Sequence, residues 1–203
     1  MRVGKVPVVE KILIFIKHHL SFLWKAIEWG NGFIFCLFYK AKIEEVLPLV
    51  FQSFAKAPYT YRKLRLSDAG LLSEMIARQD ASDLEYFRPH RFNLASVRKQ
   101  FNKCSFLMMG VFEEEKIIGY FFLRFFANRK CFVGRLIDKN YRGMGIGNVM
   151  NKIMYETAWR MGFRCLSTIS RHNKAIMKAH SKNQKMRVIK ELQHDYLLVE
   201  FIR

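Results

Sequence analysis

The residues with the clearest chemical pattern are the glycines of segment 142–147, which lie between an expected strand over 131–137 and an expected helix over 148–161. Glycines let backbone N–H groups converge, and the first turn of a helix adds unpaired N–H groups and a positive dipole end. Such a loop binds phosphate oxygens. No Gly-Lys-Ser/Thr follows, and glycines at the first, third and sixth positions are missing, so neither common nucleotide-binding fingerprint is present. A plain flexible turn is the alternative.

A second segment, 168–173, places Asn173 after an expected strand over 165–169 and before an expected helix over 174–181. Together the two segments resemble the GNAT superfamily, whose pyrophosphate loop reads Arg/Gln-x-x-Gly-x-Gly/Ala and whose later asparagine contacts the pantetheine arm. Asn173 could equally be only a helix cap. The resemblance, over about residues 59–203, implies acetyl-CoA as cofactor, bound by Leu136, Ile137, Arg142, Gly143, Met144, Gly145, Ile146, Gly147 and Asn173.

The same resemblance implies the fold. We expect an α+β domain with a mixed, mostly antiparallel central sheet flanked by helices. The strands around Leu136 and Ser167 should splay apart, which would leave the backbone of 134–137 free to pair with pantetheine. This separation is an expectation from the family, and the spacing of the residues alone does not show it.

Amide formation from a thioester needs a general base for the amine. The segment 83–90 combines acidic, aromatic and imidazole groups where the family commonly builds its acceptor pocket, and Glu85 and His90 are the candidate bases. Asp138, at the end of a strand beside the glycine loop, is a third candidate. An ordinary surface linker would also explain the composition of 83–90.

A proton donor for the departing thiolate is harder to assign. The family often has a tyrosine seven residues after the asparagine, but this chain has His180 there. An imidazole with an ordinary pKa of about 6.5 could donate a proton near neutral pH. A histidine that simply faces solvent on the helix is the alternative.

The composition limits the function classes. The 203 residues are 51% hydrophobic and 26% charged, as in a folded domain, and the formal charge is +18. Such a charge attracts anions, but the basic residues are scattered, so we expect no nucleic-acid binding. The four cysteines are far apart in the sequence, which predicts no metal site and four buried or free thiols in a reducing compartment.

Residues 58–203 should form the catalytic domain, with a further strand over 61–66, helices over 68–79 and 94–102, a hairpin over 106–126 and a closing strand over 196–202. Residues 1–57 should form a separate amphipathic helical arm.

In that arm, we expect a helix over 8–29 that ends at Gly30-Asn31-Gly32, an apolar stretch over 33–39 and a helix over 43–54. Glu28 should lie on the polar face of the first helix and Ile27 on its apolar face. Charged residues interrupt the first stretch, so none of it should span a membrane. The arm either contacts a membrane surface through residues 8–39 or covers its own domain or a homodimer partner.

These observations favour an acyltransferase that moves an acetyl group from acetyl-CoA to a small-molecule amine, such as a sugar or envelope-precursor amine. We expect it in the cytoplasm, with the inner face of the membrane as a second location. The alternative function is a non-catalytic domain of the same fold that binds a membrane or a partner. The sequence leaves transfer to a hydroxyl group open.

Overall fold

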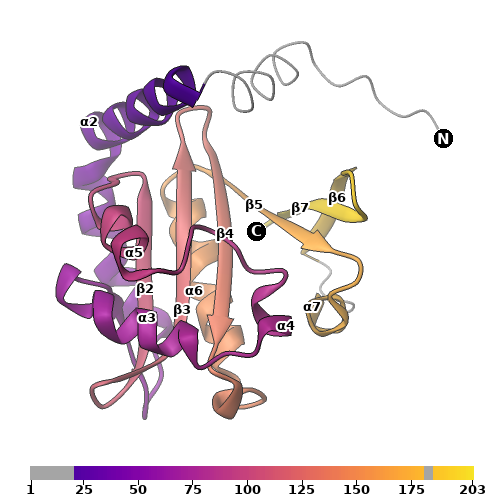
Figure 1. Cartoon of the computed structure of the whole chain (residues 1–203). Coiled ribbons are helices and arrows are strands. Elements are labelled where there is room, and N and C mark those ends of the chain that lie inside the picture. Colours follow the sequence, from indigo (N-terminus) through magenta and orange to yellow (C-terminus); the bar gives the residue numbers. More distant parts are fainter. Residues whose placement is uncertain (1–20, 181–184) are drawn as a thin grey trace.

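The computed structural model describes residues 21–180 and 185–203 (Figure 1). The order of elements expected after residue 57 is confirmed, and the additions are a short helix, α4, and a strand, β6. The helices and strands are α2 (Ser21–Phe54), β1 (Thr60–Lys63), α3 (Ala69–Ala77), α4 (Ala81–Leu84), α5 (Leu94–Phe101), β2 (Phe106–Glu113), β3 (Lys116–Phe126), β4 (Lys130–Ile137), α6 (Ile146–Arg160), β5 (Arg164–Ser170), α7 (Lys174–His180), β6 (Met186–Glu191) and β7 (Tyr196–Phe201).

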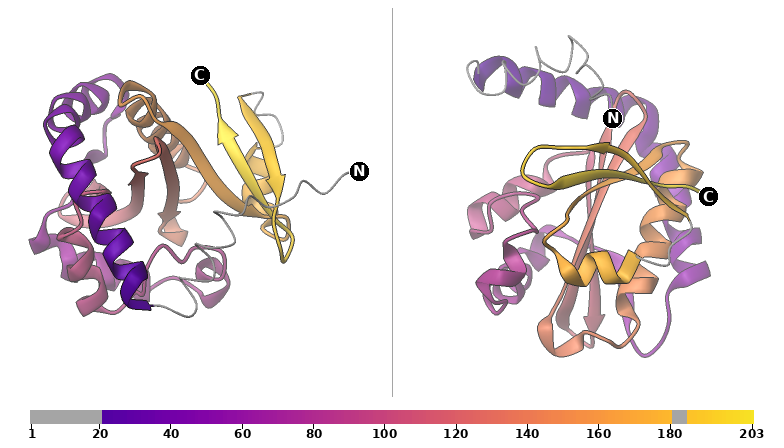
Figure 2. Two further views of the ribbon diagram at one scale, coloured as in Figure 1. Left: turned by 90° about the horizontal axis from the view of Figure 1, so that it is seen from above. Right: turned by 90° about the vertical axis from the view of Figure 1, so that its right-hand side faces the viewer.

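The strands form one sheet in the order β1-β2-β3-β4-β5-β7-β6. Every neighbouring pair is antiparallel except β4 and β5, which are parallel. Helices α3 and α5 cover one face of the sheet, and α2 and α6 cover the other (Figures 1 and 2). The expected mixed, mostly antiparallel α+β fold is confirmed.

Strand β3 separates the two cores, because successive side chains of a strand point to opposite faces. Phe121, Leu123 and Phe125 pack toward α2 and α6, whereas Tyr120 and Phe122 pack toward α3 and α5. All five side chains are buried. The phenylalanines of this strand therefore serve as packing groups on both faces of the sheet.

The two central strands separate after a short parallel ladder. Residues 130–132 of β4 pair with residues 164–166 of β5, and no ladder joins the strands beyond them. The hydroxyl of Ser167 still donates to the carbonyl oxygen of Val133 at 3.1 Å. Further on, β4 pairs only with β3, and β5 pairs only with β7. The expected splay is confirmed.

Helix α2 is continuous from Ser21 to Phe54, so the prediction that Gly30-Asn31-Gly32 ends a helix is wrong. Two glycines cost about 2 kcal/mol of helix propensity, but tertiary contacts hold the turn in place. The side chain of Asn31 donates to the carbonyl oxygen of Phe125 at 2.9 Å and accepts from the N–H of Ala127 at 2.7 Å. Phe35, one turn further along, is buried in the main core.

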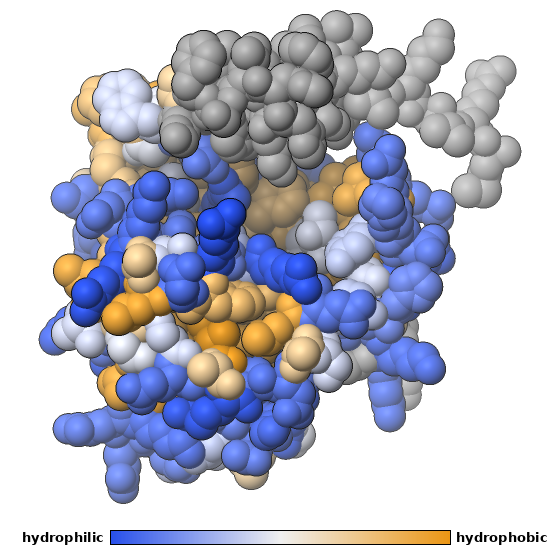
Figure 3. All heavy atoms as spheres, viewed as in Figure 1, coloured by the Kyte–Doolittle hydropathy of each residue, from blue (hydrophilic) through white to orange (hydrophobic). Residues whose placement is uncertain are grey.

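Of the two predicted faces of the arm, the structure describes Ile27 and Glu28, and it shows that Ile27 does not help to cover the domain. Ile27 is exposed, and Glu28 turns toward the domain, where its carboxylate lies 2.6 Å from the Arg124 guanidinium. The half-buried ion pair therefore joins α2 to the end of β3, and apolar groups point outward, as the atoms over the upper left of Figure 3 show. Residues 8–20 of the predicted helix lie outside the described residues. In the described part of the chain, no helix is long and apolar enough to cross a membrane.

The cysteine prediction is wrong for one pair. Cys36 of α2 and Cys104, which precedes β2, form a disulfide with Cα atoms 5.7 Å apart, although 68 residues separate them in the sequence. Sequence spacing could not show this, because the contact arises from the packing of α2 across the sheet. Cys131 and Cys165 are buried thiols, as expected.

Candidate active site

The glycine loop adopts a backbone that other residues rarely tolerate. Gly143 and Gly145 have φ values of 82° and 79°, in the left-handed region, and Gly145 is the N-cap of α6. In the described residues, no backbone hydrogen bond uses the N–H groups of 143–147. The loop therefore presents a row of free donors at the positive end of a 15-residue helix, which is the arrangement that binds phosphate.

Arg142 fastens this loop to the opposite wall. Its guanidinium makes two contacts with the Asp83 carboxylate, at 2.9 and 2.8 Å. The hydrogen bond from Arg142 holds the pKa of Asp83 below its usual range. Asp83 belongs to α4, so the ion pair joins the loop to the short helix that the sequence did not predict.

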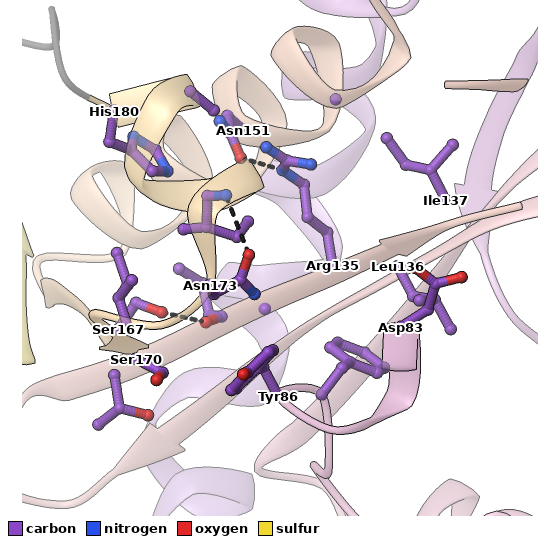
Figure 4. Close-up of a pocket in the computed structure, with 18 of the residues that line it drawn as sticks. Asp83, Tyr86, Arg135, Leu136, Ile137, Asn151, Ser167, Ser170, Asn173 and His180 are labelled. Atoms are coloured by element: carbon purple, nitrogen blue, oxygen red, sulfur yellow. Dashed lines mark hydrogen bonds between the residues drawn. The ribbon is translucent and has the colours of Figure 1, made fainter. Parts of the chain in front are cut away.

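The splay between β4 and β5 opens into a cavity of about 930 Å³. The loop closes one end, α6 and α7 form one wall, and segment 82–89 forms the other (Figure 4). Several predicted cofactor residues line it, namely Leu136, Ile137, Arg142, Gly143, Gly145, Gly147 and Asn173. Met144 is exposed at the tip of the loop and Ile146 is buried in the core, and neither lines the cavity.

Residues 73–184, more than half of the chain, match the acetyltransferase (GNAT) family. The chain belongs to this family. No match is found among curated proteins.

Solved structures share the GNAT fold at low sequence identity. The GNAT domain of S. lividans PAT has a TM-score of 0.61 at 13% identity, covering 70% of this chain and 88% of that one. PaiA N-acetyltransferase from Thermoplasma acidophilum, in complex with coenzyme A, has a TM-score of 0.59 at 17% identity, covering 71% and 99%. The enzyme that modifies the N-terminal serine of ribosomal protein L7/L12 in Salmonella typhimurium has a TM-score of 0.55 at 16% identity, covering 71% and 93%.

The GNAT asparagine position is held firmly by the helix that follows it. The side-chain oxygen of Asn173 accepts from the N–H of Ile176 at 3.1 Å, so the residue caps α7. Asn173 is therefore a helix cap, as one of the two interpretations predicted. Asn173 also lines the cavity, and a contact with pantetheine stays a prediction.

The three candidate catalytic residues are not brought together. Glu85 and His180 line the cavity, from the end of α4 and the end of α7. His90 lies outside the cavity lining, among aromatic rings under α5. Its Nδ1 donates to the carbonyl oxygen of Arg91 at 2.8 Å, and its Nε2 accepts from the buried Tyr120 hydroxyl at 3.0 Å. Both ring nitrogens are occupied, so His90 is poorly placed to remove a proton from an acceptor.

His180 has the wrong protonation state for the predicted proton donor. Burial, with a smaller effect from the nearby Arg135 charge, lowers its pKa to about 4. The ring is 7% exposed and packs 5.3 Å from the ring of Phe201, centroid to centroid. The imidazole is therefore neutral at pH 7.

Sequence reasoning missed Arg135, a half-buried cation of the cavity wall. Its side chain extends from β4 toward α6, where its Nε donates to the Asn151 side-chain oxygen at 2.8 Å (Figure 4). Among the described residues it has no ion-pair partner, and burial lowers its pKa. Arginine nevertheless stays charged at neutral pH. One signal could have revealed it. Side chains alternate between the two faces of a strand, so Arg135 shares a face with the apolar Cys131 and Val133, where a charged residue is unexpected.

Proposed function

We propose that the chain transfers an acetyl group from acetyl-CoA to a small-molecule amine. The observation that carries this proposal is the splay between β4 and β5, which ends at a loop whose N–H groups have no backbone partner. A volume of about 930 Å³ suits a ligand of this size. The coenzyme A bound to the PaiA enzyme, which has the same fold, supports the choice of cofactor.

The two ends of the cavity would bind different parts of acetyl-CoA. The N–H groups of 143–147 would hold the pyrophosphate, and the unpaired edge of β4 over 134–137 would hold the pantetheine arm, together with Asn173. When bound, acetyl-CoA supplies a thioester, which an amine can attack. Segment 82–89, on the opposite wall of the cavity, would then face the acceptor.

Glu85 is the base that the geometry favours. Two carboxylates, Asp83 and Glu85, line the cavity wall that faces the splay. Asp83 forms an ion pair with Arg142, whereas none of the described arginines forms an ion pair with Glu85. A carboxylate in this place can accept the proton of an attacking ammonium group, directly or through water.

Arg135 would replace the proton donor that His180 cannot provide. A neutral imidazole does not release a proton as an imidazolium does, but a guanidinium can stabilise the negative charge of a departing thiolate without proton transfer. The Arg135 charge is close enough to His180 to lower its pKa. Arg135 therefore lies near the end of α7, where the family usually has its proton donor.

The acceptor should be anionic or neutral. Four cationic side chains line the cavity (Arg88, Arg135, Arg142 and Lys174), against two carboxylates (Asp83 and Glu85). The excess of positive charge opposes a polyamine and favours an amine that also carries phosphate, such as a sugar nucleotide of an envelope precursor.

The experiment is a turnover assay on the full chain with acetyl-CoA and a panel of amino sugars, amino-sugar nucleotides and polyamines, measuring coenzyme A release. We expect Glu85→Gln to lower kcat by about 10²- to 10⁴-fold while acetyl-CoA still binds. Asp80→Asn is the matched control, because Asp80 begins the same helix and pairs with Lys139 instead. Binding of acetyl-CoA with no turnover on any acceptor would support the non-catalytic alternative.

A further inference from the structure

We propose that the outward face of α2 docks on an anionic lipid surface, with the helix lying in the plane of the headgroups. We call this face the outward α2 face. It comprises six large apolar side chains that are each 40% to 72% exposed: Ile27, Trp29, Phe33, Ile34, Leu37 and Phe38.

The spacing of these residues makes the face continuous. Trp29, Phe33 and Leu37 recur every four residues and form one line along the helix, and Ile34 and Phe38 form a second line beside it. The rings of Trp29 and Phe33 stack, with centroids 5.6 Å apart. Single exposed apolar residues are ordinary, but a contiguous group of this size indicates an interaction surface.

The described residues of the domain, 58–180 and 185–203, leave this face exposed, because the opposite side of α2 does the packing. Phe35, Ile43, Leu47 and Val50 are buried in the core shared with α6 and β3. The disulfide at Cys36 and the hydrogen bonds of Asn31 fix the orientation of the helix. The outward α2 face therefore projects from the molecule in a fixed direction.

Charge favours a lipid surface over a second copy of the chain. Each copy carries a formal charge of +18. Near the face, Glu28 is shared by two cations, Arg124 and Lys103, and Arg129 is exposed in the hairpin turn that Asn31 holds. Two copies joined through this face would bring these cations together. An anionic bilayer would attract them.

The dimensions fit a helix that lies on the surface. The apolar outward stretch from Ala26 to Phe38 is about 18 Å long at 1.5 Å per residue. Beyond it, the exposed Lys40 and Lys42 are followed by exposed Glu44 and Glu45, which end the apolar face. Aromatic and aliphatic groups on one side of a helix, with basic groups at its flanks, are typical of segments that bind at the headgroup boundary.

The test uses the full chain and two kinds of vesicle. One is phosphatidylcholine alone, and the other contains about 30% phosphatidylglycerol, which imitates the anionic lipid content of a cell membrane. Cosedimentation measures partitioning, and the blue shift that Trp29→Phe removes from the tryptophan emission reports burial of Trp29. The variant is Phe33→Glu/Leu37→Glu, which changes two exposed side chains and leaves the core face intact. The control is Leu49→Glu/Leu94→Glu, which places the same charge at exposed leucines outside the face.

We expect the wild type to bind the anionic vesicles, with a blue shift of its tryptophan emission. Binding should be weaker in about 0.5 M salt, because salt at this concentration screens the attraction between the basic groups and the lipid headgroups. The Phe33→Glu/Leu37→Glu variant should bind at least about tenfold more weakly, whereas the control should bind like the wild type. Circular dichroism and thermal unfolding confirm that each variant folds. Equal binding by all three proteins, or none by the wild type, would overturn the proposal. So would a dimer in light scattering that the Phe33→Glu/Leu37→Glu variant alone dissociates.

Discussion

The guanidinium of Arg142 and the carboxylate of Asp83 face each other across the mouth of the cavity, with contacts of 2.9 and 2.8 Å. Arg142 is the residue that matches the arginine of the GNAT pyrophosphate loop, yet its charge is offset before any ligand arrives. The cofactor loop is thereby connected to α4, which carries the candidate base at its end. The ion pair therefore joins the loop directly to the segment that carries Glu85.

We predict that Asp83→Asn raises the affinity for coenzyme A by about two- to fivefold at low ionic strength, because the uncompensated Arg142 then attracts the pyrophosphate. The gain should disappear in 0.5 M salt, where the Debye length falls to roughly 4 Å. Titration calorimetry measures both affinities. Asp80→Asn removes an equal charge from the same helix and controls for net charge. Weaker binding by Asp83→Asn would mean that the ion pair chiefly holds the loop in shape.

Arg135→Leu should lower kcat by about 10- to 10³-fold, because the departing thiolate loses its nearby cation. The affinity for acetyl-CoA should change by less than about threefold, since the pyrophosphate is bound at the loop. Arg135→Lys keeps the charge and should recover part of the rate. If Arg135→Leu lowers affinity and leaves kcat unchanged, the guanidinium contacts the cofactor itself and not the developing charge.

His180 should make stability depend on pH in a defined direction. Its pKa is about 4 in the folded chain and about 6.5 when unfolded. The unfolded state therefore binds the proton more readily, and stability is lost as pH falls from about 6.5 toward 4. Urea unfolding at pH 7.5 and 4.5 should show that His180→Gln loses about 1–3 kcal/mol less than the wild type over this interval. An equal loss in both proteins would place the His180 pKa near its ordinary value.

The Cys36–Cys104 bond predicts the number of titratable thiols. Protein purified without reductant and then denatured should show two thiols, Cys131 and Cys165. Cys36→Ser should lower the free energy of unfolding by about 2–4 kcal/mol under oxidising conditions, because the disulfide closes a long loop. Under reducing conditions the same substitution should have little effect. Four thiols in the unreduced protein would show that the bond does not form.

Local signals in the sequence were sufficient for much of this structure. The alternating glycines predicted the loop before α6, because positive φ and converging N–H groups favour glycine. Periodicity predicted β2 to β5 and α5 to α7 with small errors at their ends. The splay came from the family resemblance, since strand separation leaves no mark on the spacing of residues.

Contacts between distant segments were what the sequence could not show. Helix α2 continues through Gly30 and Gly32 because Asn31 is held by the end of β3, almost 100 residues further along the chain. The Arg142–Asp83 pair spans 59 positions. The exclusion of His90 from the cavity follows from the aromatic rings around it, and the low pKa of His180 follows from burial. Each of these is a property of tertiary packing.

The central claim is that the loop over 143–147 binds the pyrophosphate of acetyl-CoA, and titration calorimetry of the wild type, Gly145→Ala and Gly145→Glu tests it most directly. A Cβ atom at Gly145 meets nothing within 4 Å, and both variants carry the same strain at φ 79°. They differ in the carboxylate that Gly145→Glu adds beside the phosphates. We predict binding by the wild type, moderately weaker binding by Gly145→Ala, and a loss of at least about 100-fold in Gly145→Glu relative to Gly145→Ala. Equal affinities in the two variants, or no binding by the wild type, would contradict the account.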